Sequence, residues 1–223
     1  MVQSLHPSTS TAKESTFIPT FVYLGSTLSH VGSLLPEINR RRGIAASVLQ
    51  GLHKPLWRHR NISRKTKLRI YNASVLSVLL YGAETWPLNK TLEARLDGFD
   101  SRALRRIENI HWSQHVTNEE LRLRTQQPPA SIFAARKRLR WYGHLQRLPE
   151  EHPTKMIVDF DPPTAGWARP RGAPRTRWVD TIAKDLHQLG LTLDDARPIT
   201  QDRRQWRNLV DLFGSTRPPA HED

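Results

Sequence analysis

The stretch SRKTKLRIYNASVLSVLLY, residues 63–81, decides how this chain folds. Ser63 is a favourable N-cap residue, because its hydroxyl can accept a hydrogen bond from the first helical turn. Apolar side chains then recur at spacings of three and four residues, the period of a helix with one buried face: Leu68, Tyr71, Val75, Val78 and Leu79. Basic residues of the first two turns lie away from that stripe. The stretch therefore predicts a helix with one core-facing side and a positively charged start.

The same reasoning predicts helices along most of the chain. Besides residues 63–81, they cover about residues 36–51, 92–110, 117–123, 130–148, 177–189 and 200–213. Before them, the β-prone run Phe21–Leu24, a turn at Gly25–Ser26 and the returning pair Thr27–Leu28 predict a β-hairpin. The predicted fold is mainly α, a helical bundle with one short N-terminal β-hairpin and a long basic loop before the C-terminal helices.

Composition shifts divide the chain into five predicted parts. A Ser/Thr-rich leader without periodicity is expected to be disordered, and a Pro- and Gly-rich stretch is expected to be irregular. The parts are the leader 1–16, the hairpin 17–30, a helical region 31–111, a helical C-terminal region 112–214 that contains the basic loop 150–174, and a flexible tail 215–223.

Positive charge is abundant and unevenly distributed. Lys and Arg number 34 against 21 Asp and Glu, for a formal net charge of +13. The excess is concentrated in residues 31–90, with eleven basic and two acidic side chains, and in residues 131–180, with ten and five. Arginine forks phosphate oxygens and stacks on planar rings, so this pattern favours a polyanionic partner, most simply nucleic acid. The alternative is a set of Arg-rich, solvated helix faces.

Several classes of protein are excluded or disfavoured. The chain has no cysteine, which removes disulfides, thiolate zinc sites and cysteine nucleophiles. It has no run of 18 apolar residues and no secretory signal pattern, so we expect an intracellular protein, nuclear or cytoplasmic, with no membrane partner.

The sequence offers no convincing catalytic or metal site. Asp159 and Asp161 form a pair without a third carboxylate at motif spacing, and a solvated turn is the better interpretation. His111 and His115 lack a further ligand, so they are interpreted as surface or packing residues. Nucleotide-binding glycine motifs are absent. We predict no catalytic residue, no metal and no cofactor.

Seven short motifs follow one another along most of the chain. They are FVYLGS (21–26), EINRR (37–41), ISRKTKLRIY (62–71), LLYGAETW (79–86), LRWYGH (139–144), PRTRW (174–178) and DRRQWR (202–207). Together, and in this order, they resemble the segment after the palm in non-LTR (LINE-type) retrotransposon reverse transcriptases. Two positions depart from the family: Val22 stands where Lys is common, and Ala173 where Arg is common, and each removes one possible phosphate contact.

The resemblance implies a fragment of such an enzyme. The hairpin would be the primer grip, the helices from Pro36 onward the thumb, and the region after about Trp112 the C-terminal extension. Polymerisation needs two metal ions held by palm aspartates, which the family carries before the primer grip. Here Glu14 is the only acidic residue before Phe21. We therefore expect that the chain is not an enzyme by itself.

The predicted function is binding of RNA, DNA or an RNA–DNA hybrid through phosphates, with little base specificity. The predicted contacts are Tyr23, Leu24 and Gly25 in the primer grip; Arg40, Arg41, Arg42, Lys65, Lys67 and Arg69 in the thumb; and Arg138, Arg140, Arg171, Arg175 and Arg177 in a second patch. A palm-containing reverse transcriptase segment is a further predicted partner.

Three readings remain open on the sequence. The chain is a decayed retroelement product without a cellular role, an independent nucleic-acid-binding or scaffold module, or a subunit that completes a split enzyme by docking on a palm. A two-stranded hairpin is marginal alone. We therefore expect Phe17, Phe21 and Tyr23 to be partly exposed when no palm covers them.

Overall fold

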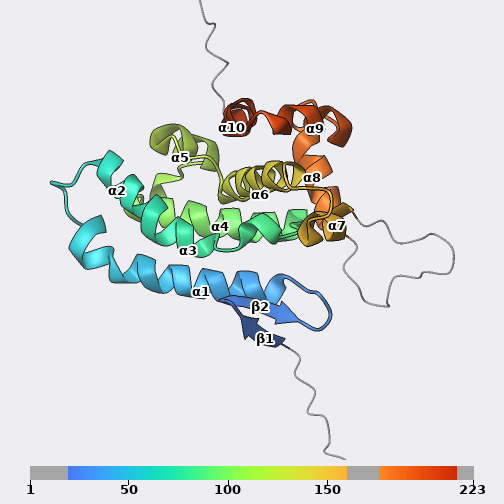
Figure 1. The fold of residues 1–223 in the computed structure, drawn as a ribbon. Coiled ribbons are helices and arrows are strands. Elements are labelled where there is room, and N and C mark those ends of the chain that lie inside the picture. Colours follow the sequence, from blue (N-terminus) through green and yellow to red (C-terminus); the bar gives the residue numbers. More distant parts are fainter. Residues whose placement is uncertain (1–19, 160–175, 215–223) are drawn as a thin grey trace, which may run out of the picture.

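The computed structural model describes residues 20–159 and 176–214, which form a mainly α-helical fold with one β-hairpin, as predicted (Figure 1). The predicted leader 1–16, Phe17, the tail 215–223 and most of the basic loop lie outside the described residues. The α-helices are α1 (Leu35–Gly51), α2 (Arg64–Ile70), α3 (Ser77–Leu79), α4 (Lys90–Ile107), α5 (Asn118–Thr125), α6 (Ala130–Gln146), α7 (Pro153–Asp159), α8 (Trp178–His187), α9 (Leu193–Gln201) and α10 (Arg203–Leu212). Short 3-10 turns cover Ala83–Thr85 and Trp112–Gln114.

Residues 64–79 of the predicted segment are helical, with a change of helix type in the middle, and the helix ends two residues before the predicted Tyr81. The Ser63 hydroxyl accepts a hydrogen bond from the Thr66 amide at 3.2 Å and so caps α2. A π-helical segment, Tyr71–Leu76, then joins α2 to α3. Of the predicted stripe, Leu68, Tyr71, Val75 and Leu79 are buried and Val78 is partly buried. Leu76, at the end of the π-helical segment, is also buried in the core.

The hairpin consists of β1 (Thr20–Tyr23) and β2 (Ser26–Ser29), paired antiparallel with Tyr23 opposite Ser26. Its turn residues are Leu24 and Gly25, one position earlier than predicted. Both have positive φ, 46° and 80°, as a two-residue turn that matches the strand twist requires. The hairpin lies along α1 (Figure 1). As expected, Phe21 and Tyr23 are more than half exposed.

Two apolar clusters form the core of the described residues, and α6 contributes to both. The first is built from α1 to α5 together with Ala130 and Ala134 of α6. The second packs α6 against α8, α9 and α10 through residues such as Leu139, Ile182 and Trp206. Asp97 of α4 fixes the start of α6, because its carboxylate accepts hydrogen bonds from the Ser131 amide and hydroxyl, both at 2.8 Å.

A buried polar network ties the π-helical segment to α4 and α5. The Tyr71 hydroxyl donates to the Asp100 carboxylate, which also forms an ion pair with Arg122 at 2.6 Å. Burial and the charge of Asp100 raise the pKa of Tyr71 well above its ordinary value. The hydroxyl therefore stays protonated and available as a donor, which keeps the network intact.

Two helices in the C-terminal half differ from the prediction. Part of the predicted irregular loop, Pro153–Asp159, is helix α7. The predicted helix 200–213 is found as α10, whereas α9 was not predicted. Asp202 separates the two, because it ends α9 in an extended conformation and caps α10 through the Arg204 and Gln205 amides. Helix α9 begins with a Thr192–Asp195 capping box and contains Pro198, a residue that disfavours helix in sequence-based reasoning.

Candidate nucleic-acid interface

The arginines next to the hairpin hold its turn in place. The Arg40 and Arg41 guanidinium groups both donate to the Gly25 carbonyl, Arg40 at 2.9 Å. Arg41 also pairs with the Glu37 carboxylate at 2.7 Å and lies over the Tyr81 ring, 4.3 Å from its centroid. The other Glu37 oxygen accepts from the Thr27 amide at 2.7 Å. Helix α1 therefore grips the hairpin through side-chain hydrogen bonds.

This arrangement corrects the prediction for Arg41. Its side chain is buried and its donors are used by Glu37 and Gly25, so it holds the hairpin and is not a surface phosphate contact. Burial acts to raise the pKa of Glu37, but the hydrogen bonds from Arg41 and Thr27 outweigh it and lower that pKa. The carboxylate is thus charged near neutral pH. Arg40 is partly exposed and stays a predicted contact.

The predicted primer-grip residues form the tip of the hairpin. Tyr23 is 59% exposed and Leu24 78% exposed. The Gly25 carbonyl is occupied by the two arginines, and the Tyr81 hydroxyl donates to the Leu24 carbonyl at 3.3 Å. The side chains of Tyr23 and Leu24 are therefore exposed and open to a partner at this tip.

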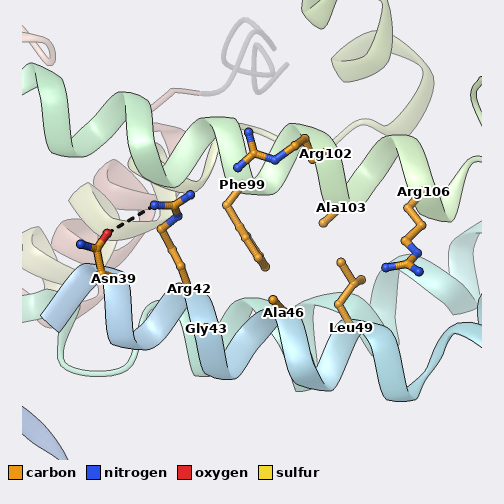
Figure 2. Close-up of a pocket in the computed structure, with 9 residues that line it drawn as sticks. All are labelled: Asn39, Arg42, Gly43, Ala46, Leu49, Phe99, Arg102, Ala103 and Arg106. Carbon is orange, nitrogen blue, oxygen red and sulfur yellow. Dashed lines mark hydrogen bonds between the residues drawn. The ribbon is translucent and has the colours of Figure 1, made fainter. Parts of the chain in front are cut away.

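Helices α1 and α4 enclose a groove whose charged lining residues are all arginine (Figure 2). Its volume is about 480 Å³, and it is lined by Asn39, Arg42, Gly43, Ala46, Leu49, Phe99, Arg102, Ala103 and Arg106. A second hollow continues from it, shares Arg42 and Arg102, and adds Lys90 and Arg95. We call Arg42, Arg95, Arg102 and Arg106 the groove arginines.

Within residues 20–159 and 176–214, no carboxylate forms an ion pair with any groove arginine. Among the described residues, Arg42 donates one long hydrogen bond, 3.4 Å, to the Asn39 side chain, and its buried Nε has no partner. Burial, followed by the charges of Arg102 and Arg95, lowers the pKa of Arg42. Like charges held together in this way create a strong positive potential that an anion would relieve.

Sequence reasoning identified Arg42 but missed Arg95, Arg102 and Arg106. A signal was present, because positions 95, 102 and 106 are seven and four residues apart and so share one face of a helix. The apolar stripe of the same helix is the stronger pattern, so the prediction relied on that stripe and overlooked the arginine face. The relation to Arg42 could not be found from spacing, since it depends on how α1 packs on α4.

The basic side chains of α2 lie outside the groove lining. Lys65 and Arg69 are exposed, and no hydrogen bond or ion pair links either of them to another described residue. Lys67 is half-buried and donates to the Trp57 carbonyl at 2.8 Å. Lys65 and Arg69 are thus the more accessible predicted contacts on this helix.

The predicted second patch is largely neutralised where the structure describes it. Arg138 is 1% exposed and forms a bidentate ion pair with Asp185, Nε to Oδ2 at 2.9 Å and Nη2 to Oδ1 at 3.1 Å. This corrects the prediction for Arg138, which joins α6 to α8 inside the protein. Arg140 pairs with Asp211 and Arg177 with Asp180 at the surface. Arg171 and Arg175 lie outside the described residues.

Trp178 and Trp206, which stand next to arginines in the sequence, are packing residues of the second apolar cluster. Trp206 is buried and its ring nitrogen donates to the Leu139 carbonyl at 2.9 Å. Trp178 donates to the Glu84 carbonyl at 2.8 Å. Their arginine neighbours therefore do not mark stacking platforms for bases at these positions.

The described part of the chain offers no metal centre and no membrane-spanning helix. No group of three potential metal ligands occurs among these residues, and none of their helices is long and apolar enough to cross a membrane. His111 accepts from the Ser113 amide and caps the short turn Trp112–Gln114, which is a local structural role. Asp161 of the predicted turn lies outside the described residues.

Comparisons with known proteins find a relative that is named as transposon-derived and a family model of unknown function. It is 26% identical over 211 residues to an uncharacterized transposon-derived protein of Caenorhabditis elegans, covering 92% of this chain and 74% of that protein. Residues 52–81 match a family described as a domain of unknown function, DUF6451. No solved structure matches. A transposon-derived homologue agrees with the interpretation of this chain as a retroelement relic.

Proposed function

We propose that this chain is a fragment resembling the thumb and C-terminal region of a retroelement reverse transcriptase, which binds nucleic acid through phosphates and does not polymerise alone. The single observation that carries the binding proposal is the groove between α1 and α4, with its unneutralised groove arginines. Nucleic-acid phosphates supply repeated negative charge, which a line of unpaired arginines attracts. The transposon-derived homologue supports the retroelement origin.

The hairpin supports a second part of the proposal, docking on a palm-containing segment. Phe21, Tyr23 and Leu28 are 54%, 59% and 44% exposed, and the register places Phe21 opposite Leu28 on one face of the hairpin. An apolar face of this kind is unusual for a solvated two-stranded hairpin. A protein surface that covers it would complete the fold.

The test is binding of the full chain to an RNA–DNA hybrid across a salt series, with primer extension measured alongside. We expect binding that weakens with salt, and no extension. Changing Arg42, Arg95 and Arg102 of the groove to Ala should lower the salt slope by about 0.9 for each phosphate that is no longer neutralised, equally for unrelated sequences. Changing the exposed Arg203, Arg204 and Arg207 of α10 removes the same charge and is the matched control.

Each outcome has a clear meaning. A loss of affinity confined to one base sequence would contradict binding through phosphates. Equal losses in the two triple variants would show that net charge, rather than the groove between α1 and α4, drives binding. No binding at moderate salt would contradict the binding proposal and favour a retroelement relic that does not bind nucleic acid. Primer extension would contradict the expectation that the chain does not polymerise alone.

A further inference from the structure

The groove between α1 and α4 combines a cationic rim with an apolar floor. The floor is made by Gly43, Ala46 and Leu49 of α1 and by Phe99 and Ala103 of α4. Figure 2 shows Phe99 reaching toward α1 between Arg42 and Arg102. An apolar floor does not favour a phosphate, because the phosphate is charged and would lose its hydration there without gaining a hydrogen bond.

Small residues on α1 keep the floor open. Gly43 and Ala46 are exposed, and a Cβ placed on Gly43 would meet no atom within 4 Å. Larger side chains at these two positions would fill the space between the helices. The resulting volume, about 480 Å³, lies within the range of pockets that hold a small organic group, roughly 300–1,000 Å³.

We infer that the groove binds a single-stranded segment of nucleic acid, with an unpaired base on the Ala46–Phe99 floor and the flanking phosphates at Arg42 and Arg102. This inference rests on the proposed function and specifies its ligand. In a duplex the faces of the bases are stacked inside and cannot reach an apolar floor, whereas unpaired bases can be turned out and packed on apolar or aromatic side chains.

The spacing of the groove arginines gives the length of the site. On α4, positions 95 and 106 are eleven residues apart, which corresponds to about 16 Å of helix rise. At about 3.4 Å per phosphate along one stacked strand, this row spans about five nucleotides. That length is at the short end of the range for protein surfaces that track a single strand, ~4–16 nucleotides.

The variant that tests the inference is Ala46→Leu, which fills the floor without changing charge. Leucine is a good helix former and position 46 is exposed, so the variant is expected to fold. Ser47→Leu is the matched control, since Ser47 is exposed on the same helix and does not line the groove. Thermal unfolding followed by circular dichroism confirms folding of both.

Binding is measured by fluorescence anisotropy with a 12-nucleotide oligothymidine, the corresponding RNA–DNA hybrid and inorganic polyphosphate. Ala46→Leu is expected to weaken oligothymidine binding about tenfold, the effect of losing one packed base. It should weaken hybrid and polyphosphate binding much less, because neither places a base on the floor, and Ser47→Leu should alter none of the three. Arg102→Gln should lower the salt slope for oligothymidine by about 0.7.

Two results would overturn the inference. Unchanged oligothymidine binding by Ala46→Leu would show that the floor is not used. Equal weakening for oligothymidine, hybrid and polyphosphate would show a phosphate site with no place for a base. Both results leave the proposed function standing, whereas failure of the wild-type chain to bind any nucleic acid at low salt would remove the proposed function itself.

Discussion

Gly143 of α6 lies directly against Trp206 of α10, and its replacement by alanine tests how the two helices pack. A Cβ at this position would overlap Nε1 and Cδ1 of Trp206 and would lie 3.0 Å from Cε2. Trp206 is buried on α10 and its ring nitrogen donates to the Leu139 carbonyl. The indole cannot shift without losing that hydrogen bond, so Gly143→Ala is expected to destabilise the protein.

The magnitude follows from three opposing effects. Overpacking of a core position costs about 1–3 kcal/mol. Loss of the Trp206 hydrogen bond adds about 1 kcal/mol. Alanine favours the helix over glycine by about 0.5–1 kcal/mol, which offsets part of the cost. The expected net loss is about 2 kcal/mol, and for a chain of this size that lowers the melting temperature by about 6 °C.

The assay is urea unfolding of the full chain, with thermal unfolding as a second measure. Gly43→Ala is the matched control, because position 43 is also inside a helix and a Cβ there meets no neighbour within 4 Å. The control should be more stable than wild type by about 0.5–1 kcal/mol. If Gly143→Ala matched the stability of wild type or of Gly43→Ala, the close packing of α6 on α10 would be refuted.

Two further predictions concern buried carboxylates. Arg138→Ala should cost about 3–5 kcal/mol in urea unfolding, because it leaves Asp185 buried without a partner, and the double variant Arg138→Met, Asp185→Leu should recover most of the loss. Burial raises the pKa of Asp97 above 3.8, so its ionisation in the folded state is disfavoured and its contribution to stability falls as pH rises through that raised pKa. Unfolding of wild type and Asp97→Asn is measured at a series of pH values from about 4 to 7. The free energy of unfolding of wild type, relative to that of the variant, should decrease as pH rises. A constant difference would contradict the raised pKa of Asp97.

The helical part of the fold was predictable because it depends on local chemistry. In residues 63–81, Ser63 predicts the N-cap of the helix and the spacing of the apolar residues predicts its buried face. Both are found as expected. The hairpin was also predictable from its β-prone run, although its turn was placed one residue late. Helix α9 was missed because Pro198 argues against helix locally, while Ile199 and Ala196 pack against the second core cluster.

The candidate site was only partly predictable, because the role of an arginine depends on what lies opposite it. Arg138 and Asp185 are 47 residues apart, and nothing in the spacing of either predicts their ion pair. Arg42 and Arg102 are 60 residues apart and line the same groove, and no carboxylate among the described residues pairs with either. An arginine that is paired with a carboxylate and one that is not add the same positive charge to the net charge of the sequence, so the sequence cannot distinguish them.

The net charge of +13 is therefore a weaker argument for nucleic-acid binding than it looked in the sequence. Arg41 holds the hairpin turn, Arg138 joins two helices, and Arg140 and Arg177 have carboxylate partners. The groove arginines differ because no carboxylate among the described residues neutralises them. A cluster of like charges lowers stability unless a ligand offsets the repulsion. This unfavourable arrangement, and not the total charge, is the reason to expect a polyanion between α1 and α4.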